Sequence, residues 1–141
     1  KDISKIENKT VIFETRLKPR NKNGIKLGGG SDYDCSLDLF FNFGAIEYTS
    51  GSGEKELASN AYNRTDSSWM TVTVVLDLSA QEFDLTVDVE DGGAVAGDTY
   101  QALDKSFVSP VSDLNEIKFY IPWDRNGADG FKVDYIKIYE E

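Results

Sequence analysis

Apolar and polar residues alternate along much of this chain with a period of two, the repeat of a β-strand that buries one face. Between residues 11 and 17, every second residue is apolar or threonine, and most positions between them are charged. The same alternation, or a short apolar run, recurs at 37–43, 45–48, 70–76, 83–89, 114–121 and 131–139. No window carries the apolar repeat of an amphipathic helix. The pattern therefore predicts an all-β chain.

Clusters of Gly with Asn, Asp or Ser separate these segments, and such residues mark turns because they supply positive φ angles or short side-chain caps. The clusters lie at 21–24, 28–31, 50–53, 91–93 and 126–130. Short strands between such turns indicate an antiparallel β-sandwich, a jelly roll of two sheets. We expect one domain over residues 1–141. Because the chain begins at Lys1 rather than at Met, we expect this domain to be part of a longer multi-modular protein.

The order of the segments resembles that of a known family. A strand VIFETRLKP at 11–19 is followed by FNFGAI at 41–46, WMTVTVVLD at 69–77, FDLTVD at 83–88 and FKVDYIKIY at 131–139. This order is similar to that of the concanavalin-like, laminin-G-like β-sandwich domains of bacterial polysaccharide-degrading enzymes. The resemblance implies a noncatalytic carbohydrate-binding domain. Such a domain would be secreted, monomeric and joined to a host catalytic module in the same chain.

Composition excludes several functional classes. The 141 residues contain no histidine, which excludes a Ser-His-Asp triad and histidine-ligated zinc. The single cysteine cannot form an internal disulfide. No run of about 18 apolar residues predicts a membrane helix, so we expect no membrane partner. The net charge of -10 argues against a nucleic-acid partner.

Aromatic side chains are the strongest candidates for a binding site, because sugar rings present apolar C–H faces that stack on them. Trp123 lies in a polar turn, where an exposed indole has no structural use. Tyr120 lies on the strand face opposite the predicted core residues and close to Trp123. Tyr62, in a polar stretch, is a further candidate. Polar groups that could bind the hydroxyl rim of a sugar flank Trp123: Asp124, Arg125 and Asn126.

Charge divides the possible ligands into two classes. The first 26 residues hold eight basic and three acidic side chains, a net +5, whereas the rest of the chain carries -15. If Arg16 and Lys18 face the binding site, we expect an acidic polysaccharide such as pectin, bound through Arg–carboxylate contacts. If they lie on the far face, a neutral cell-wall β-glucan, xyloglucan or xylan fits better. The overall negative charge favours the neutral ligand.

Calcium is the one cofactor that the sequence suggests. The resemblance implies a structural calcium that joins the first and last strands, and Glu14 and Asp134 are the positions that could hold it. The alternative is that both are exposed strand carboxylates. The oxygen-rich segment 124–129 departs by one residue from a calcium-loop pattern, so it does not match as a motif.

Two other functional classes stay open. One is an adhesin or surface domain that binds a partner through its loops. The other is a sandwich-type glycoside hydrolase, which needs a pair of carboxyl groups about 5–5.5 Å apart in its retaining form. Asp84 and Asp88 are the nearest pair in the sequence, but acids that alternate with apolar residues are typical of the solvated face of a strand. An enzyme is therefore the least favoured class.

Overall fold

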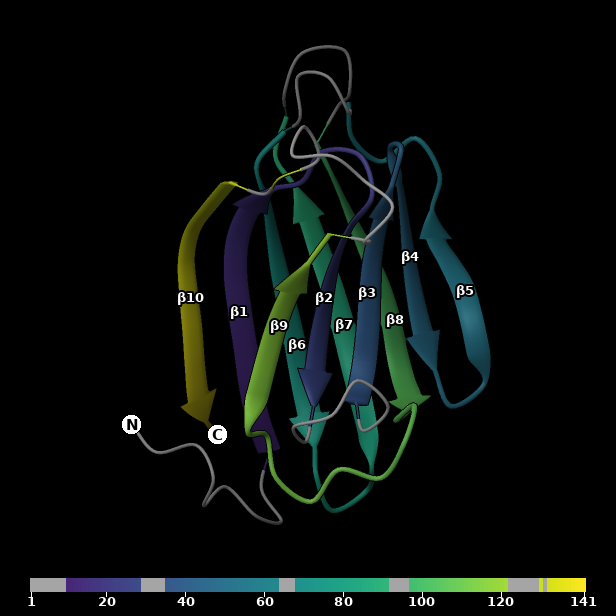
Figure 1. The fold of residues 1–141 in the computed structure, drawn as a ribbon, viewed down its shortest axis with the longest axis vertical. Coiled ribbons are helices and arrows are strands. Elements are labelled where there is room, and N and C mark those ends of the chain that lie inside the picture. Colours follow the sequence, from purple (N-terminus) through teal and green to yellow (C-terminus); the bar gives the residue numbers. More distant parts are fainter. Residues whose placement is uncertain (1–9, 29–34, 64–67, 92–96, 122–129, 131) are drawn as a thin grey trace.

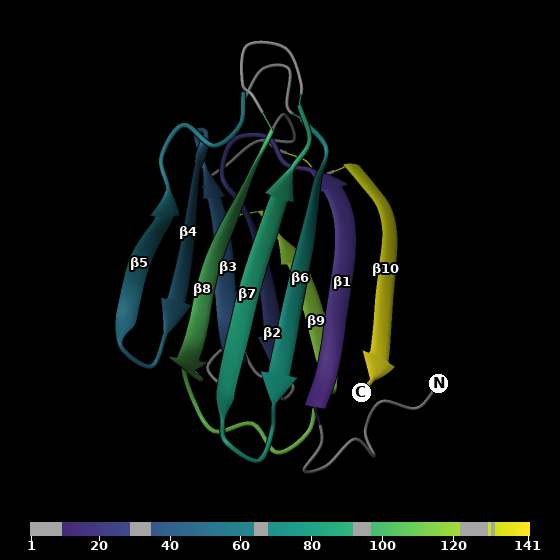
Figure 2. The ribbon, with the colours of Figure 1, turned by 180° about the vertical axis from the view of Figure 1, so that it is seen from behind.

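The computed structural model describes residues 10–28, 35–63, 68–91, 97–121, 130 and 132–141. These residues form ten strands in two antiparallel sheets (Figures 1 and 2). The first sheet has the order β10-β1-β6-β7-β8 and the second the order β5-β4-β3-β2-β9. The strands are β1 (Thr10–Lys18), β2 (Asn23–Gly28), β3 (Cys35–Asn42), β4 (Ala45–Ser50), β5 (Gly53–Ala58), β6 (Met70–Asp77), β7 (Glu82–Val89), β8 (Asp98–Ser106), β9 (Glu116–Tyr120) and β10 (Lys132–Glu140).

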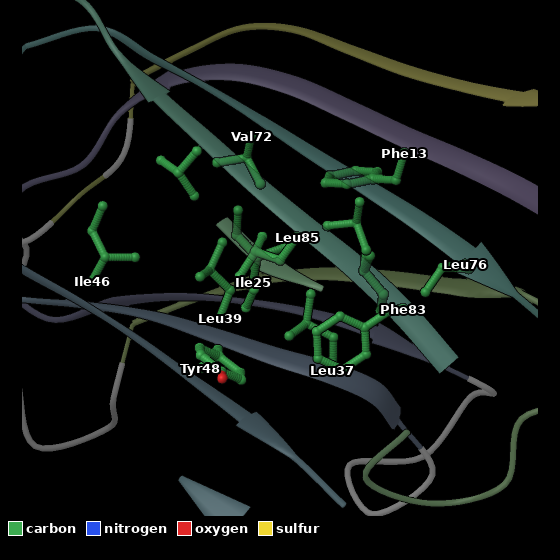
Figure 3. Packing of buried hydrophobic residues seen from close by; sticks show 14 of the residues in the cluster. Phe13, Ile25, Leu37, Leu39, Ile46, Tyr48, Val72, Leu76, Phe83 and Leu85 are labelled. Atoms are coloured by element: carbon green, nitrogen blue, oxygen red, sulfur yellow. The ribbon is translucent and has the colours of Figure 1, made fainter. Parts of the chain in front are cut away.

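The two sheets pack face to face, and alternate residues of the central strands fill the space between them (Figure 3). On β1 the buried positions are those that the period of two predicts, Val11, Phe13, Thr15 and Leu17. Facing them from the second sheet are apolar residues of β2, β3 and β4, among them Ile25, Leu39 and Ile46. The prediction of an all-β sandwich of two antiparallel sheets is confirmed. In the described part of the chain, no helix is long and apolar enough to cross a membrane.

Three strands lie where the sequence pattern did not predict them. β2 overlaps the predicted turn at 21–24, because Asn23 and Gly24 pair with Phe41 and Phe40 of β3. β5 and β8 are edge strands whose residues are mostly exposed, so their sequences GEKELA and DTYQALDKS show little alternation of apolar and polar positions. Pairing with a neighbouring strand, rather than an apolar face, defines these two strands.

Each sheet turns one face towards solvent, and the two outer faces carry different side chains. The outer face of the first sheet includes Glu14 and Arg16 of β1, which alternate with the buried residues. The outer face of the second sheet includes Phe40 of β3 and Tyr120 of β9, the two residues that the backbone register places on either side of Gly24. Figure 1 looks onto the second sheet and Figure 2 onto the first.

Candidate functional site

The aromatic ring of Tyr120 lies across the backbone of β2. Gly24 is directly opposite Tyr120 in the register of β2 and β9, and a Cβ atom added at Gly24 would overlap the Tyr120 ring. A glycine at this position therefore leaves room for the Tyr120 ring, and any larger residue would displace the ring from the strand. The tyrosine that the sequence predicted to point away from the core lies flat on the outer face of the second sheet.

Phe40 extends this ring into a larger apolar surface. It lies opposite Gly24 on the other side of β2, and its ring centroid is 6.2 Å from that of Tyr120, with 26° between the ring planes. Both rings are only half-buried. The two rings over the glycine, which we call the Tyr120–Phe40 platform, form an aromatic surface across three strands. Such a surface can stack against the apolar face of a ligand ring.

Asp38 and Lys26 hold the Tyr120 ring in place. The Tyr120 hydroxyl donates a hydrogen bond of 2.7 Å to Asp38 Oδ1, and Lys26 Nζ lies 3.9 Å from Asp38 Oδ2 and 5.2 Å from the Tyr120 ring centroid. Burial raises the pKa of the Tyr120 phenol, and the hydrogen bond to Asp38 raises it further, so Tyr120 stays a donor. Burial also raises the pKa of Asp38, against the opposing effects of Tyr120 and Lys26.

Polar groups border the platform on the side of β4. Glu47 lies directly opposite Phe40, and its Oε1 accepts a hydrogen bond of 3.1 Å from Asn42 Nδ2. The platform therefore has a tyrosine–aspartate–lysine group on one border and an asparagine–glutamate pair on the other. This combination of an aromatic surface with fixed donors and acceptors suits a ligand that is apolar on its ring face and polar at its rim.

Part of the predicted site lies outside the described residues. Trp123, Asp124, Arg125 and Asn126 belong to the segment 122–129, of which the structure describes nothing. This segment begins two residues after Tyr120 in the sequence. The structure thus places Tyr120, and the role of its four predicted companions stays a prediction.

Tyr62 is not a surface platform, and the prediction for this residue is corrected. Its side chain is only 3% exposed, it packs edge-on against Phe41 at 6.1 Å, and its hydroxyl donates to the Arg20 carbonyl at 2.9 Å. Burial raises the pKa of the phenol. Residues that bury this ring, such as Phe41, lie far from Tyr62 in sequence. The polar residues next to Tyr62 in the sequence therefore did not indicate its burial.

Arg16 and Lys18 lie on the outer face of the first sheet, whereas the platform lies on the outer face of the second sheet. The Arg16 guanidinium donates two hydrogen bonds to Glu90, of 2.9 and 3.0 Å, and one of 2.8 Å to Asp134. It also covers the Trp69 ring at 4.4 Å, with Lys18 Nζ at 5.4 Å. Arg16 is therefore engaged with groups of the protein itself, and the structure does not bring it together with Tyr120.

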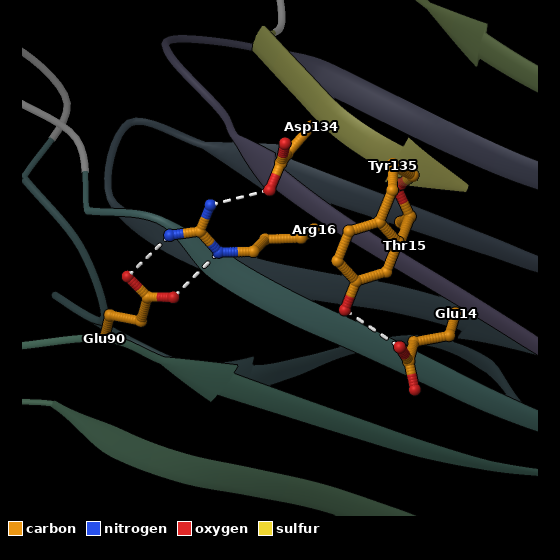
Figure 4. A network of polar contacts seen from close by, with 6 residues as sticks. All are labelled: Glu14, Thr15, Arg16, Glu90, Asp134 and Tyr135. Carbon is orange, nitrogen blue, oxygen red and sulfur yellow. Dashed lines mark hydrogen bonds and ion pairs between the residues drawn. The ribbon is translucent and has the colours of Figure 1, made fainter. Parts of the chain in front are cut away.

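Glu14 and Asp134 each contact other side chains of the protein, and the calcium that the sequence suggests between them stays a prediction. Glu14 Oε1 accepts a hydrogen bond of 2.8 Å from the Tyr135 hydroxyl and lies 3.6 Å from Lys137 Nζ, whereas Asp134 binds Arg16 (Figure 4). A cation beside each carboxylate disfavours calcium, which needs six to eight oxygen ligands. Among the described residues, no group of three or more His, Cys, Asp or Glu could hold a metal ion. These observations favour two strand carboxylates that bind neighbouring side chains, with Asp134 exposed and Glu14 partly buried.

Sequence reasoning missed Gly24, Phe40 and Asp38. Phe40 was detectable, because it is a large apolar residue out of phase with the buried Leu39 and Phe41. Gly24 and Asp38 gave no such signal. Their roles depend on the register that aligns β2, β3 and β9, and no local pattern encodes that register.

No family model matches this chain, and no curated protein sequence matches it. Among solved structures, chicken galectin 2 is similar with a TM-score of 0.55 and 16% identity, over 95% of this chain and 94% of the galectin. An ancestral congerin is similar with a TM-score of 0.52 and 15% identity, over 99% and 98% of the two chains. A variant of an ancestral congerin has a TM-score of 0.50 and 12% identity, over 95% and 98%. At these identities the likeness concerns the fold alone, a galectin-like sandwich of the concanavalin-like class.

Proposed function

We propose that this protein is a noncatalytic carbohydrate-binding domain that binds a polysaccharide on the outer face of the second sheet. The observation that carries this proposal is the Tyr120–Phe40 platform, built over Gly24 and bordered by Asp38 and Glu47. The C–H face of a sugar ring would stack on the aromatic rings. Its hydroxyl groups would donate to the carboxylates at the border. Galectins are carbohydrate-binding lectins without enzymatic activity, and the shared fold is consistent with this proposal.

The position of Arg16 and Lys18, the basic residues that the sequence analysis singled out, supports a ligand that is not acidic. Arg16 and Lys18 lie on the other sheet, and the Arg16 guanidinium is already bound to Glu90 and Asp134. This is the arrangement for which the sequence analysis expects a neutral β-glucan, xyloglucan or xylan rather than pectin. In a secreted multi-modular enzyme, such a domain would raise the effective concentration of the catalytic module on its substrate.

An enzymatic role has little support at the two carboxylates that the sequence singled out. Asp84 Oδ1 accepts a hydrogen bond from the Asp104 backbone N–H at 2.8 Å, and Asp88 Oδ1 accepts one from the Thr99 hydroxyl at 2.5 Å. Both carboxylates lie on the outer face of β7 and connect it to β8. These contacts give each of them a structural partner.

Affinity electrophoresis against soluble neutral and acidic polysaccharides tests the proposal. We expect the wild-type domain to be retarded by a neutral polysaccharide, with micromolar or weaker affinity, on the order of −8 kcal/mol at most. Tyr120→Ala and Phe40→Ala should abolish the retardation, and Trp123→Ala tests the undescribed segment. Tyr139→Ala is the matched control, because Tyr139 is a 43% exposed tyrosine on β10 of the first sheet.

Three outcomes of this experiment matter. Loss of retardation in the platform variants, but not in Tyr139→Ala, supports the proposal. Retardation that survives both platform substitutions would show that the sugar binds elsewhere. If no polysaccharide retards the wild-type domain, carbohydrate binding is wrong, and an interaction with a protein partner becomes the leading hypothesis.

A further inference from the structure

The border of the platform on the side of β4 and β5 carries an excess of negative charge. Phe40, Glu47 and Glu56 lie in one row across β3, β4 and β5, because Phe40 pairs with Glu47 and Glu47 with Glu56. In the next row, Asp38 pairs with Thr49, which pairs with Glu54. Three glutamates thus lie on two adjacent strands: Glu47 is directly beside the Phe40 ring, and Glu54 and Glu56 are one strand further from it.

This arrangement is unfavourable for the free protein. Like charges directly opposite each other on paired strands are destabilising, and the register places Glu47 opposite Glu56. Glu54 also adds to the raised pKa of Asp38 and of Tyr120, so its charge reaches the platform. No Lys or Arg among the described residues forms an ion pair with any of the three glutamates, although Lys26 pairs with Asp38 nearby.

Positive charge lies towards the other end of the platform. Lys26 and Lys118 face each other across β2 and β9, in the row next to Tyr120, and Lys26 pairs with Asp38. The platform therefore has lysines beside its Tyr120 end, at β2 and β9, and glutamates beyond its Phe40 end, at β4 and β5. A ligand that stacks on the platform experiences this charge difference, and a positively charged substituent is stabilised only on the side of β4 and β5.

We propose that the polysaccharide bound at this face carries protonated amino groups, as in a polymer of amino sugars that are not acetylated. This inference rests on the proposed function, since the platform supplies the stacking and the glutamates select among sugars. When a sugar ring stacks on the platform, a protonated amine that points towards β4 and β5 lies near Glu47, with Glu56 on the next strand. The amine relieves the repulsion between these carboxylates when it binds.

The test compares two ligands that share the ring and the linkage but differ in the amino group. Glucosamine oligomers and N-acetylglucosamine oligomers of equal length share the ring and the linkage, but acetylation removes the positive charge. In calorimetric titrations at low salt, we expect the wild-type domain to bind the free-amine oligomer about tenfold more tightly, at about threefold for each exposed amine–carboxylate contact. Raising the salt concentration should remove most of the difference.

Two double variants separate a local effect from the general attraction of a polycation to an acidic protein. Glu54→Gln/Glu56→Gln alters two exposed side chains at the acidic border and should reduce the preference for the amine to about twofold. Glu82→Gln/Asp104→Asn makes the same change in net charge on exposed residues of β7 and β8. It should leave the preference unchanged.

Each result bears on a different claim. Equal binding of the two oligomers, or an equal loss in both double variants, would overturn the amino-sugar inference and leave carbohydrate binding intact. Binding of the free-amine oligomer that Tyr120→Ala does not weaken would also overturn it, because the contact would then be purely electrostatic. If neither oligomer and no neutral polysaccharide binds, the proposed function itself fails.

Discussion

The two outer faces of the sandwich are built on the same core but use their side chains differently. On the first sheet, polar side chains bind one another: Arg16 binds Glu90 and Asp134, Tyr135 binds Glu14, and the side chains of β7 bind those of β8. On the second sheet, a glycine leaves space for a tyrosine ring, which lies beside a phenylalanine with both rings partly exposed. The polar side chains of the first face bind one another, whereas the second face carries a pair of aromatic rings beside carboxylates.

This difference shows why outward position alone does not identify a binding face. Trp69 and Arg16 are on the outside of the protein, and both residue types occur often at binding sites. Here the guanidinium covers the indole and three carboxylate contacts hold it there. Two neighbouring aromatic rings that lie across several strands, with fixed polar groups beside them, are the more informative feature, and the Tyr120–Phe40 platform on the second sheet has this arrangement.

The largest expected effect comes from filling the space over Gly24. In Gly24→Val the new side chain and the Tyr120 ring cannot occupy the same volume, so the ring must leave the sheet. We expect glycan affinity to fall about 30-fold, as for loss of a central aromatic anchor, and stability to fall by about 1–3 kcal/mol from overpacking. Affinity titration and urea denaturation measure the two effects.

A double-mutant cycle tests the cause of this loss. In a Tyr120→Ala background the space over β2 is empty, so Gly24→Val should then destabilise the fold much less than in the wild type. If Gly24→Val costs the same stability in both backgrounds, the clash with Tyr120 is not its cause. Retained glycan binding in Gly24→Val would show that the ring position does not matter for recognition.

Next in size is the loss of a buried hydroxyl from Tyr62, which separates a tyrosine of the interior from the tyrosine of the platform. Tyr62→Phe leaves the Arg20 carbonyl without its donor and should cost about 1 kcal/mol of unfolding free energy. Glycan affinity should stay within twofold of the wild type, because the ring is buried. A loss of affinity as large as that in Tyr120→Ala would contradict the assignment of Tyr62 to the core.

A smaller effect is expected on the first sheet from Arg16→Met, which keeps the aliphatic stem but removes the hydrogen bonds to Glu90 and Asp134. The melting temperature should fall only modestly, since exposed ion pairs contribute little each. Affinity for the polysaccharide should not change, in contrast to the platform variants. A clear loss of binding in Arg16→Met, together with strong salt dependence, would instead point to an acidic ligand on the first sheet.

The sequence predicted the parts of the fold that depend on a buried face. β1, β6 and β7 have both neighbours paired and show strict alternation, and their boundaries agree with the expected segments. The edge strands β5 and β8 have mostly exposed residues, so hydrogen-bond pairing, which leaves little mark on composition, decides their conformation. Hydrophobic periodicity reports burial, and it fails where burial does not determine the strand.

The same reasoning explains which site residues could be found. The outward position of Tyr120 follows from the alternation with Ile117 and Phe119, so it was predictable. That positions 24, 40 and 120 meet in one row depends on register across three strands that are distant in sequence. Tyr62 shows the reverse case, in which polar sequence neighbours surround a residue that tertiary contacts bury.

The smallest expected effects concern how the free energy of unfolding depends on pH. Carboxylates on the two faces should contribute slopes of opposite sign. Burial raises the pKa of Asp38 above that of an aspartate in the unfolded chain, so folded protein binds this proton more tightly. Its contribution to stability therefore declines as the pH rises from about 4 through the raised pKa. On the first sheet, hydrogen bonds from Arg16 lower the pKa of Glu90, and backbone N–H donors at Ala80 and Ser79 lower that of Asp77. Their contributions are present above about pH 4 and are lost as the pH falls through the lowered pKa values.

Urea denaturation across this pH range, on the wild type and two isosteric variants, distinguishes the two faces. Asp38→Asn should remove the part of the profile that declines above about pH 4, since the amide has no charge to bury. Glu90→Gln should flatten only the acid limb below that pH. If both variants change stability over the same pH range, the carboxylates of the two faces do not have pKa values shifted in opposite directions. The partly desolvated Asp38 beside the platform would then no longer set the second sheet apart from the first.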